Sequence, residues 1–286
     1  MAHVEPLVVP GRFNGPPTSG NGGWVSGRLA ALLEPGPDEA VKVVLRSPPP
    51  LDAPLQVQAG ADGGLSAWSG ETPVASVNRV PSPFAAMAPG PVPWSVAQAA
   101  AGAYAGVDCH PFPTCFVCGP QREPGDGLRL SPGRLGDRPS DTAAAWVPDA
   151  SLRAAYDSGH GSDSDCIDLA VCWAALDCPG GWSLDLVGRP MVLGTMTAQV
   201  RELPRVGGRY VVVGRALGEQ GRKAFTETAL YAAASDEAAP LSPVAGASAG
   251  SVPQRPGSAD RPSAGVPLAR ATAVWLRVDP AAVRPV

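Results

Sequence analysis

The sequence contains little lysine and no basic segment. Of its 22 Lys and Arg residues only Lys42 and Lys223 are lysine, and with 26 Asp and Glu residues the net charge is −4. Proteins that bind nucleic acid neutralise its phosphates with clustered basic side chains. The composition therefore argues against nucleic acid as a partner.

Long uncharged runs are also scarce. The longest, residues 80–107, contains five prolines and would make a poor transmembrane helix, so no membrane span is expected. Residues 1–13 have neither a basic cluster nor a long apolar run, and no secretory signal is predicted. We therefore expect a cytoplasmic protein whose six cysteines are reduced thiols or metal ligands.

What the sequence does contain is compatible with a sizeable core. Apolar residues make up 44% of the 286 positions and charged residues 17%, while 34 Gly and 34 Pro indicate many loops. Residues 235–267 consist mostly of Ala, Ser, Pro and Gly. Because this composition offers little to bury, the segment is predicted to be a disordered insertion.

Deleting residues 236–266 is therefore expected to leave the fold intact. The segment holds no aromatic residue and few branched apolar ones, so its removal should cost little buried area. We expect calorimetry to give a Tm within a few degrees of the full chain. A deletion variant that fails to fold would show instead that the segment is structural.

Apolar patterns divide the first 80 residues into one helix followed by strands. Trp24, Leu29 and Leu33 lie on one face of a predicted helix over residues 24–34, which Pro35 ends. Short runs between Gly, Pro and Asp breaks predict an antiparallel meander after it. Its strands are residues 41–47, 54–60, 65–70 and 73–80.

The second half repeats this order. A strand at residues 142–148 precedes a strong helix over 165–177, with Asp165 as N-cap and Asp168 in the first turn. The sequence Cys178-Pro-Gly-Gly is expected to end that helix. Four strands are then predicted, the second and third joined by a hairpin at Gln220-Gly221. They are residues 192–203, 209–219, 223–234 and 268–278.

One apolar helix with one strand meander is best buried when the sheet wraps around the helix, which is the hotdog fold. Two such units predict an α+β double hotdog, with two antiparallel sheets, each wrapped on a central helix, joined into one. The predicted organisation is an N-terminal hotdog (1–80), a Pro-rich linker and Cys-rich connection (81–138), and a C-terminal hotdog (139–286).

The second half resembles acyl-CoA thioesterases of the hotdog superfamily. The resemblance lies in CWAALDCPGGW, LGTMTAQVREL and the strand pair RYVVVGRALGEQGRKAFTETALYAAA, and the first half is similar through FNGPPTSGNGGWVSGRLAALL. In the latter, Asn21-Gly22-Gly23 stands where single-domain members have His-Gly-Gly. The resemblance implies hydrolysis of an acyl-CoA or acyl-carrier thioester, without a cofactor, in a chain that could form a homodimer.

The resemblance also implies site residues. Double-hotdog members use an Asp, a Thr and a Gln; Asp177 and Thr195 match the first two, but residues 272–274 hold no glutamine. Asp177 would activate water, Thr195 would hold the water or the thioester oxygen, and Gly22 and Gly23 would donate N–H groups to the oxyanion. The missing glutamine leaves a non-catalytic acyl-thioester-binding or scaffold module as the alternative. A hydratase is less favoured, because no histidine lies in a predicted helix.

One segment carries possible metal ligands. Cys109, His110, Cys115 and Cys118 have donor types suited to zinc, but only one CxxC pair is present and the first two residues are adjacent. Buried free thiols are therefore the favoured interpretation, and no metal is predicted. The remaining cysteines are expected to be small core residues: Cys166, Cys172 and Cys178.

Overall fold

The computed structural model describes residues 5–84, 89–153, 165–233 and 265–280. Residues 235–264 of the predicted insertion lie outside the described residues. The strands are β1 (Leu7–Val8), β2 (Ala40–Leu45), β3 (Pro54–Ala59), β4 (Leu65–Ser69), β5 (Thr72–Val80), β6 (Gly133–Arg134), β7 (Asp141–Trp146), β8 (Met191–Val200), β9 (Tyr210–Gln220), β10 (Lys223–Ala232) and β11 (Ala269–Arg277). The helices are α1 (Gly22–Ala31), α2 (Trp94–Ala100) and α3 (Leu169–Trp182), with 3-10 turns at Gly11–Phe13, Ala101–Ala103, Ala105–Val107 and Ala150–Leu152.

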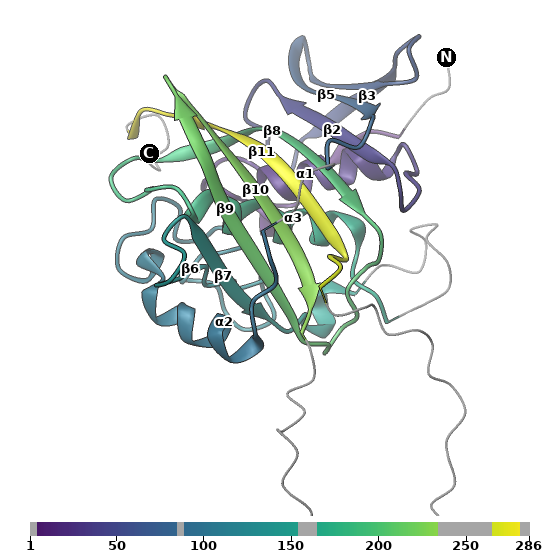
Figure 1. Ribbon diagram of the computed structural model, residues 1–286. Coiled ribbons are helices and arrows are strands. Elements are labelled where there is room, and N and C mark those ends of the chain that lie inside the picture. Colours follow the sequence, from purple (N-terminus) through teal and green to yellow (C-terminus); the bar gives the residue numbers. More distant parts are fainter. Residues whose placement is uncertain (1–4, 85–88, 154–164, 234–264, 281–286) are drawn as a thin grey trace, which may run out of the picture.

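The described strands form one continuous antiparallel sheet (Figure 1). Its order is β1-β3-β4-β5-β2-β8-β11-β10-β9-β7-β6, so the strands of the first half occupy one side and those of the second half the other. The two sides meet where β2 pairs with β8, from Val41 opposite Ala198 to Val44 opposite Thr195. The expected strands are confirmed to within a few residues, and the expected joining of the two sets of strands is observed.

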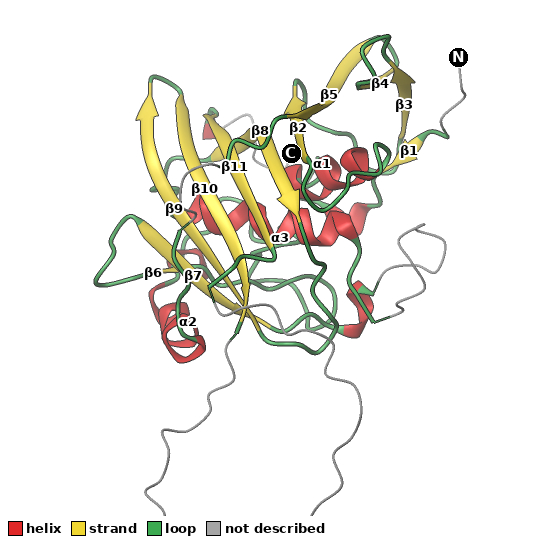
Figure 2. Cartoon of the chain, turned by 45° about the vertical axis from the view of Figure 1, so that its right-hand side comes forward, coloured by secondary structure: helices red, strands yellow, loops and turns green. Residues whose placement is uncertain are grey.

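Helices α1 and α3 lie side by side on one face of the sheet (Figure 2). They run in opposite directions and approach closely through glycines of α1. A Cβ atom at Gly27 would lie 2.6 Å from Ala170 Cα, and one at Gly23 would lie 2.6 Å from Asp177 Cβ. Because no side chain separates the helices at these positions, the N-terminal end of α1 is held directly against the C-terminal end of α3.

Both helix boundaries differ from the sequence-based expectation. Helix α1 begins at Gly22 and ends at Ala31, rather than covering residues 24–34. Helix α3 takes Asp168, not Asp165, as its N-cap: the Asp168 side chain accepts from the Ala170 N–H (2.7 Å), whereas Asp165 forms an exposed ion pair with Arg153.

Helix α3 also continues through Pro179 to Trp182, although the sequence predicted its end at Cys178. Proline removes one hydrogen bond of a helix, a cost that tertiary contacts can offset. Here the Pro179 carbonyl accepts from Thr142 Oγ1 (2.7 Å), and the Gly180 backbone packs tightly against Thr226 and Thr228 of β10. The glycines that suggested a helix end instead let the last turn fit against the sheet.

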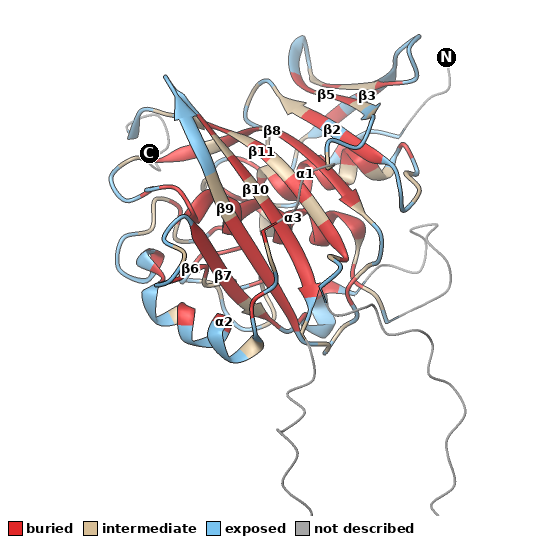
Figure 3. Cartoon of the chain, in the orientation of Figure 1, coloured by how far each residue is buried: buried red, intermediate tan, exposed pale blue. Residues whose placement is uncertain are grey.

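A second, smaller core covers part of the opposite face of the sheet, over β7, β9 and β10 (Figure 3). There α2 packs on β7 and β9, where Val211 and Val213 point toward it while Val212 points toward α3. This alternation explains why the first part of β9, residues 210–214, is apolar and buried on both faces. Among the described helices, none has the length and apolar character needed to cross a membrane.

Candidate functional site

A buried carboxylate lies where the two long helices meet. Asp177, in the C-terminal half of α3, is 3% exposed, although acids rarely occur buried. The N-terminal end of α1 lies beside it and offers the opposite end of a helix dipole, together with free backbone N–H groups. The antiparallel packing of the helices thus places the Asp177 carboxylate beside the positive end of a neighbouring helix.

Only one oxygen of Asp177 has protein partners. Oδ2 accepts from Asn21 Nδ2 (3.1 Å) and from the Gly23 N–H (3.0 Å), while Oδ1 is buried without a hydrogen-bond partner in the described structure. Burial raises the pKa of the Asp177 carboxyl to about 7, against the opposing effect of the two donors. Asp177 is therefore a carboxyl group with one hydrogen-bonded oxygen and one buried oxygen that lacks a partner among the described residues.

Asn21, Gly22 and Gly23 all lie at this junction, in separate roles. Asn21 is the N-cap of α1, its Oδ1 accepting from the Trp24 N–H (2.8 Å), so its amide orientation is fixed. The Gly23 N–H, expected as an oxyanion donor, is occupied by Asp177 instead. The N–H of Gly22 has no acceptor within the described part of the chain, and Gly22 borders the adjoining cavity.

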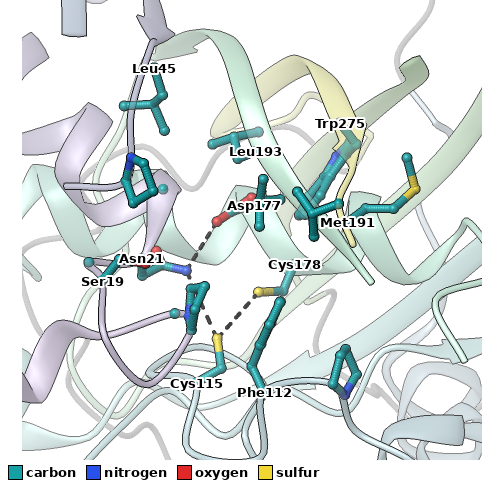
Figure 4. Close-up of a pocket in the computed structure, with 18 of the residues that line it drawn as sticks. Ser19, Asn21, Leu45, Phe112, Cys115, Asp177, Cys178, Met191, Leu193 and Trp275 are labelled. Carbon is teal, nitrogen blue, oxygen red and sulfur yellow. Dashed lines mark hydrogen bonds between the residues drawn. The ribbon is translucent and has the colours of Figure 1, made fainter. Parts of the chain in front are cut away.

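A cavity of about 310 Å³ opens beside these residues. Most of the side chains around it in Figure 4 are apolar, and they come from β2, β8, β11 and the Cys-rich segment. They include Leu45, Phe112, Met191, Leu193 and Trp275. Because both halves of the chain supply walls and only a few polar groups face inward, the cavity has the character of a small-molecule site.

Thr195 is not brought to this cavity. It lies on β8, the strand that contributes Met191 and Leu193 to the wall, but it is not among the described residues that line the space. The pairing of β8 with β11 shifts register between Val274 and Trp275, which leaves Gly194 as an extra residue. Such a bulge changes which side chains face inward after it, and a motif match along the strand cannot reveal it.

The variant Thr195→Val tests the role that the resemblance gave to this threonine. Valine keeps the shape and removes the hydroxyl, and a side chain outside the cavity cannot orient a reacting water. We expect kcat on any thioester substrate to stay within about 3-fold of the parent, well short of the ~100-fold typical of a lost catalytic group. A 100-fold loss of kcat in a correctly folded Thr195→Val variant would show instead that the Thr195 hydroxyl takes part in catalysis.

The Cys-rich segment forms the floor of the cavity. Cys115 and Cys118 are buried there beside Cys178 of α3, and Cys115 Sγ lies 3.8 Å from Cys178 Sγ. Hydrogen bonds from the Cys118 and Cys178 thiols hold the pKa of the Cys115 thiol well below its usual range. His110 contacts Cys118, whereas Cys109 is exposed. The sequence singled out four of these residues but placed Cys178 in the core, apart from them.

Sequence reasoning did not anticipate that this segment belongs to the site. The clearest signal for it was the density of Cys, His and Pro in residues 109–120, in a stretch without periodicity. Backbone contacts fix its place: the Phe116 N–H donates to the Asn14 carbonyl (2.8 Å), beside the entry to α1. The segment therefore connects the N-terminal end of α1 with the C-terminal end of α3.

No protein-family model matches the chain, and no curated protein matches it in sequence. Among solved structures it is similar to a candidate thioesterase from Novosphingobium aromaticivorans, with 11% identity, 95% of this chain and 94% of that chain covered, and a TM-score of 0.51. It is also similar to acyl-CoA thioesterase II TesB2 from Mycobacterium marinum (12% identity, 93% and 92% covered, TM-score 0.49) and to a hotdog-fold protein from Alicyclobacillus acidocaldarius (13%, 94% and 89%, 0.48). At these identities the similarity concerns the fold alone, which is an α+β hotdog architecture.

Proposed function

We propose that the protein hydrolyses an acyl thioester, with Asp177 as the carboxylate that activates water. The observation that carries the proposal is the buried carboxylate with one oxygen fixed by Asn21 and Gly23 and the other unpartnered beside an apolar cavity. We further propose that residues 1–80 and 139–286 are two hotdog units of a double hotdog, connected through residues 81–138.

The proposed reaction uses the unpartnered oxygen of Asp177 and the free N–H of Gly22, two residues that border the cavity. A water held by Asp177 Oδ1 attacks the carbonyl carbon of the thioester and gives its proton to the carboxylate. The carbonyl oxygen becomes an oxyanion, which the free N–H of Gly22 stabilises at the positive end of α1. When the carbon–sulfur bond breaks, Asp177 returns the proton to the leaving sulfur, so the products are a carboxylic acid and a thiol.

The cavity favours an acyl group of modest size. Its apolar side chains surround the space next to Asp177, and its volume of about 310 Å³ lies at the small end of ligand pockets. Arg46 borders the same cavity and offers a positive charge for an anionic carrier such as the phosphates of coenzyme A. Since both halves of the chain supply the site, this chemistry requires no second copy of the protein.

The alternative is a non-catalytic module that binds an acyl thioester. The missing glutamine and the position of Thr195 outside the cavity favour it, because two of the three groups implied by the resemblance are then lacking. The two functions differ in one respect that can be measured: a hydrolase breaks the thioester bond of its ligand, whereas a binding module leaves that bond intact.

A thioester panel separates the two. Purified protein is incubated with acyl-CoAs of increasing chain length and with the matching acyl-N-acetylcysteamine thioesters, and released thiol is followed with a chromogenic disulfide. We expect turnover of short and medium chains, with the CoA esters preferred. Saturable binding of acyl-CoA without release of thiol would identify a binding module, and neither binding nor release would reject the proposed substrate class.

A further inference from the structure

Three buried cysteines from two distant segments meet at the floor of the cavity. The sulfur atoms of Cys115, Cys118 and Cys178 all lie within 4.8 Å of one another. Cys115 and Cys118 belong to the Cys-rich segment and Cys178 to α3, so the group exists only after folding. Figure 4 shows Cys115 and Cys178 facing each other. The proposed hydrolysis uses none of these thiols.

The spacing of the sulfur atoms suits a tetrahedral metal ion. With Zn–S bonds of about 2.3 Å, the sulfur ligands of tetrahedral zinc lie about 3.8 Å apart. Cys115 Sγ and Cys178 Sγ are 3.8 Å apart. A disulfide would require an S–S distance of about 2.05 Å and would leave the third cysteine without a partner.

The backbone around Cys115 and Cys118 is built as a tight turn. The Gly119 N–H donates to the Cys115 carbonyl (2.9 Å), and a Cβ atom at Gly119 would lie 2.6 Å from the backbone of Cys115. Tyr104 fixes the same turn by donating its hydroxyl to the Cys118 carbonyl (2.7 Å). This C-x-x-C-G turn holds both sulfur atoms on one side, as a pair of metal ligands requires.

Neighbouring donors are placed to offset thiolate charge. The Phe112 N–H donates to His110 Nδ1 (2.8 Å), so the neutral ring carries its proton on Nε2, which lies 3.2 Å from Cys118 Sγ. Asn21 Nδ2 lies 4.0 Å from Cys115 Sγ. His110 is thereby a hydrogen-bond donor to a sulfur ligand, in the outer shell of the site.

We propose that Cys115, Cys118 and Cys178 bind one zinc ion, with His110 as a donor to the Cys118 sulfur. Three protein ligands leave a fourth tetrahedral position for a molecule from the cavity, such as water, because all three cysteines border that space. The ion would fasten the Cys-rich segment to the end of α3, one residue from Asp177. Cys109, which the sequence grouped with these ligands, is exposed and outside the cluster.

The test uses the full chain purified in reducing buffer without added metal and without a metal-binding tag. Elemental analysis should give about one zinc per chain, and exchange for Co²⁺ should produce the intense near-ultraviolet bands of thiolate-to-cobalt charge transfer. Cys118→Ser and Cys178→Ser should each lose most of the metal. The matched control Cys109→Ser, in the same segment, should retain it, as should His110→Gln, whose amide N–H can still donate.

Unfolding of the parent protein gives a measurement that does not depend on the variants folding. A strong chelator should lower the Tm, and zinc, but not Mg²⁺, should restore it, because a ligand that binds only the folded state stabilises that state. Zinc well below one per chain after incubation with Zn²⁺ under reducing conditions would overturn the proposal. So would a Cys115–Cys178 disulfide in protein isolated from cells, or loss of the metal in Cys109→Ser alone.

Discussion

Replacing Asp177 with asparagine is expected to lower kcat on an acyl thioester by about 100-fold or more. Asparagine keeps the shape of the side chain, and its carbonyl can still accept from Asn21 and Gly23. It cannot take a proton from water, which is the step assigned to the second oxygen. KM should change little, because the apolar walls of the cavity remain.

The stability of this variant distinguishes catalysis from folding. A neutral amide removes a buried charge, so we expect the free energy of unfolding to stay within about 1 kcal/mol of the parent. Asp168→Asn is the matched control: it makes the same change at the other end of α3, where asparagine also caps a helix. Full activity in Asp177→Asn, or an equal loss in Asp168→Asn, would contradict the assignment.

The variant Gly27→Val is expected to cause a large loss of stability. A Cβ atom at Gly27 would lie 2.6 Å from Ala170 Cα and 2.7 Å from Trp173 Cβ, and Trp173 is almost fully buried. The two helices would have to separate, at a cost of about 3 kcal/mol, which exceeds the few tenths that valine gains over glycine in helix propensity. At about 2–4 °C per kcal/mol, the Tm should fall by roughly 10 °C.

Gly136→Val provides the control for that experiment. Gly136 is exposed, and a Cβ atom there would meet no heavy atom within 4 Å, so its Tm should remain close to that of the parent. We also expect Gly27→Val to reduce activity, because the same helix contact holds Asp177 against Asn21. A Tm unchanged by Gly27→Val would mean that the helices are not packed at this distance.

Local patterns in the sequence determined most of the secondary structure. Alternating apolar residues identified the strands, and the repeat of one helix followed by strands in both halves indicated an α+β hotdog architecture. Asp177 could be selected because the motif resemblance placed it where the family has its aspartate. These features depend on neighbouring residues, so they can be recognised without knowledge of distant contacts.

Tertiary structure decided the features that depend on residues far apart in the sequence. The contact of Asp177 with Asn21 and Gly23 spans more than 150 residues, and it redirects the Gly23 N–H from an oxyanion to a carboxylate. A bulge in β8 separates Thr195 from the cavity, and packing against β10 carries α3 past Pro179. Cys178 joins Cys115 and Cys118 for the same reason: a close-packed interior fixes which side chains meet, and helix or strand periodicity carries no information about that choice.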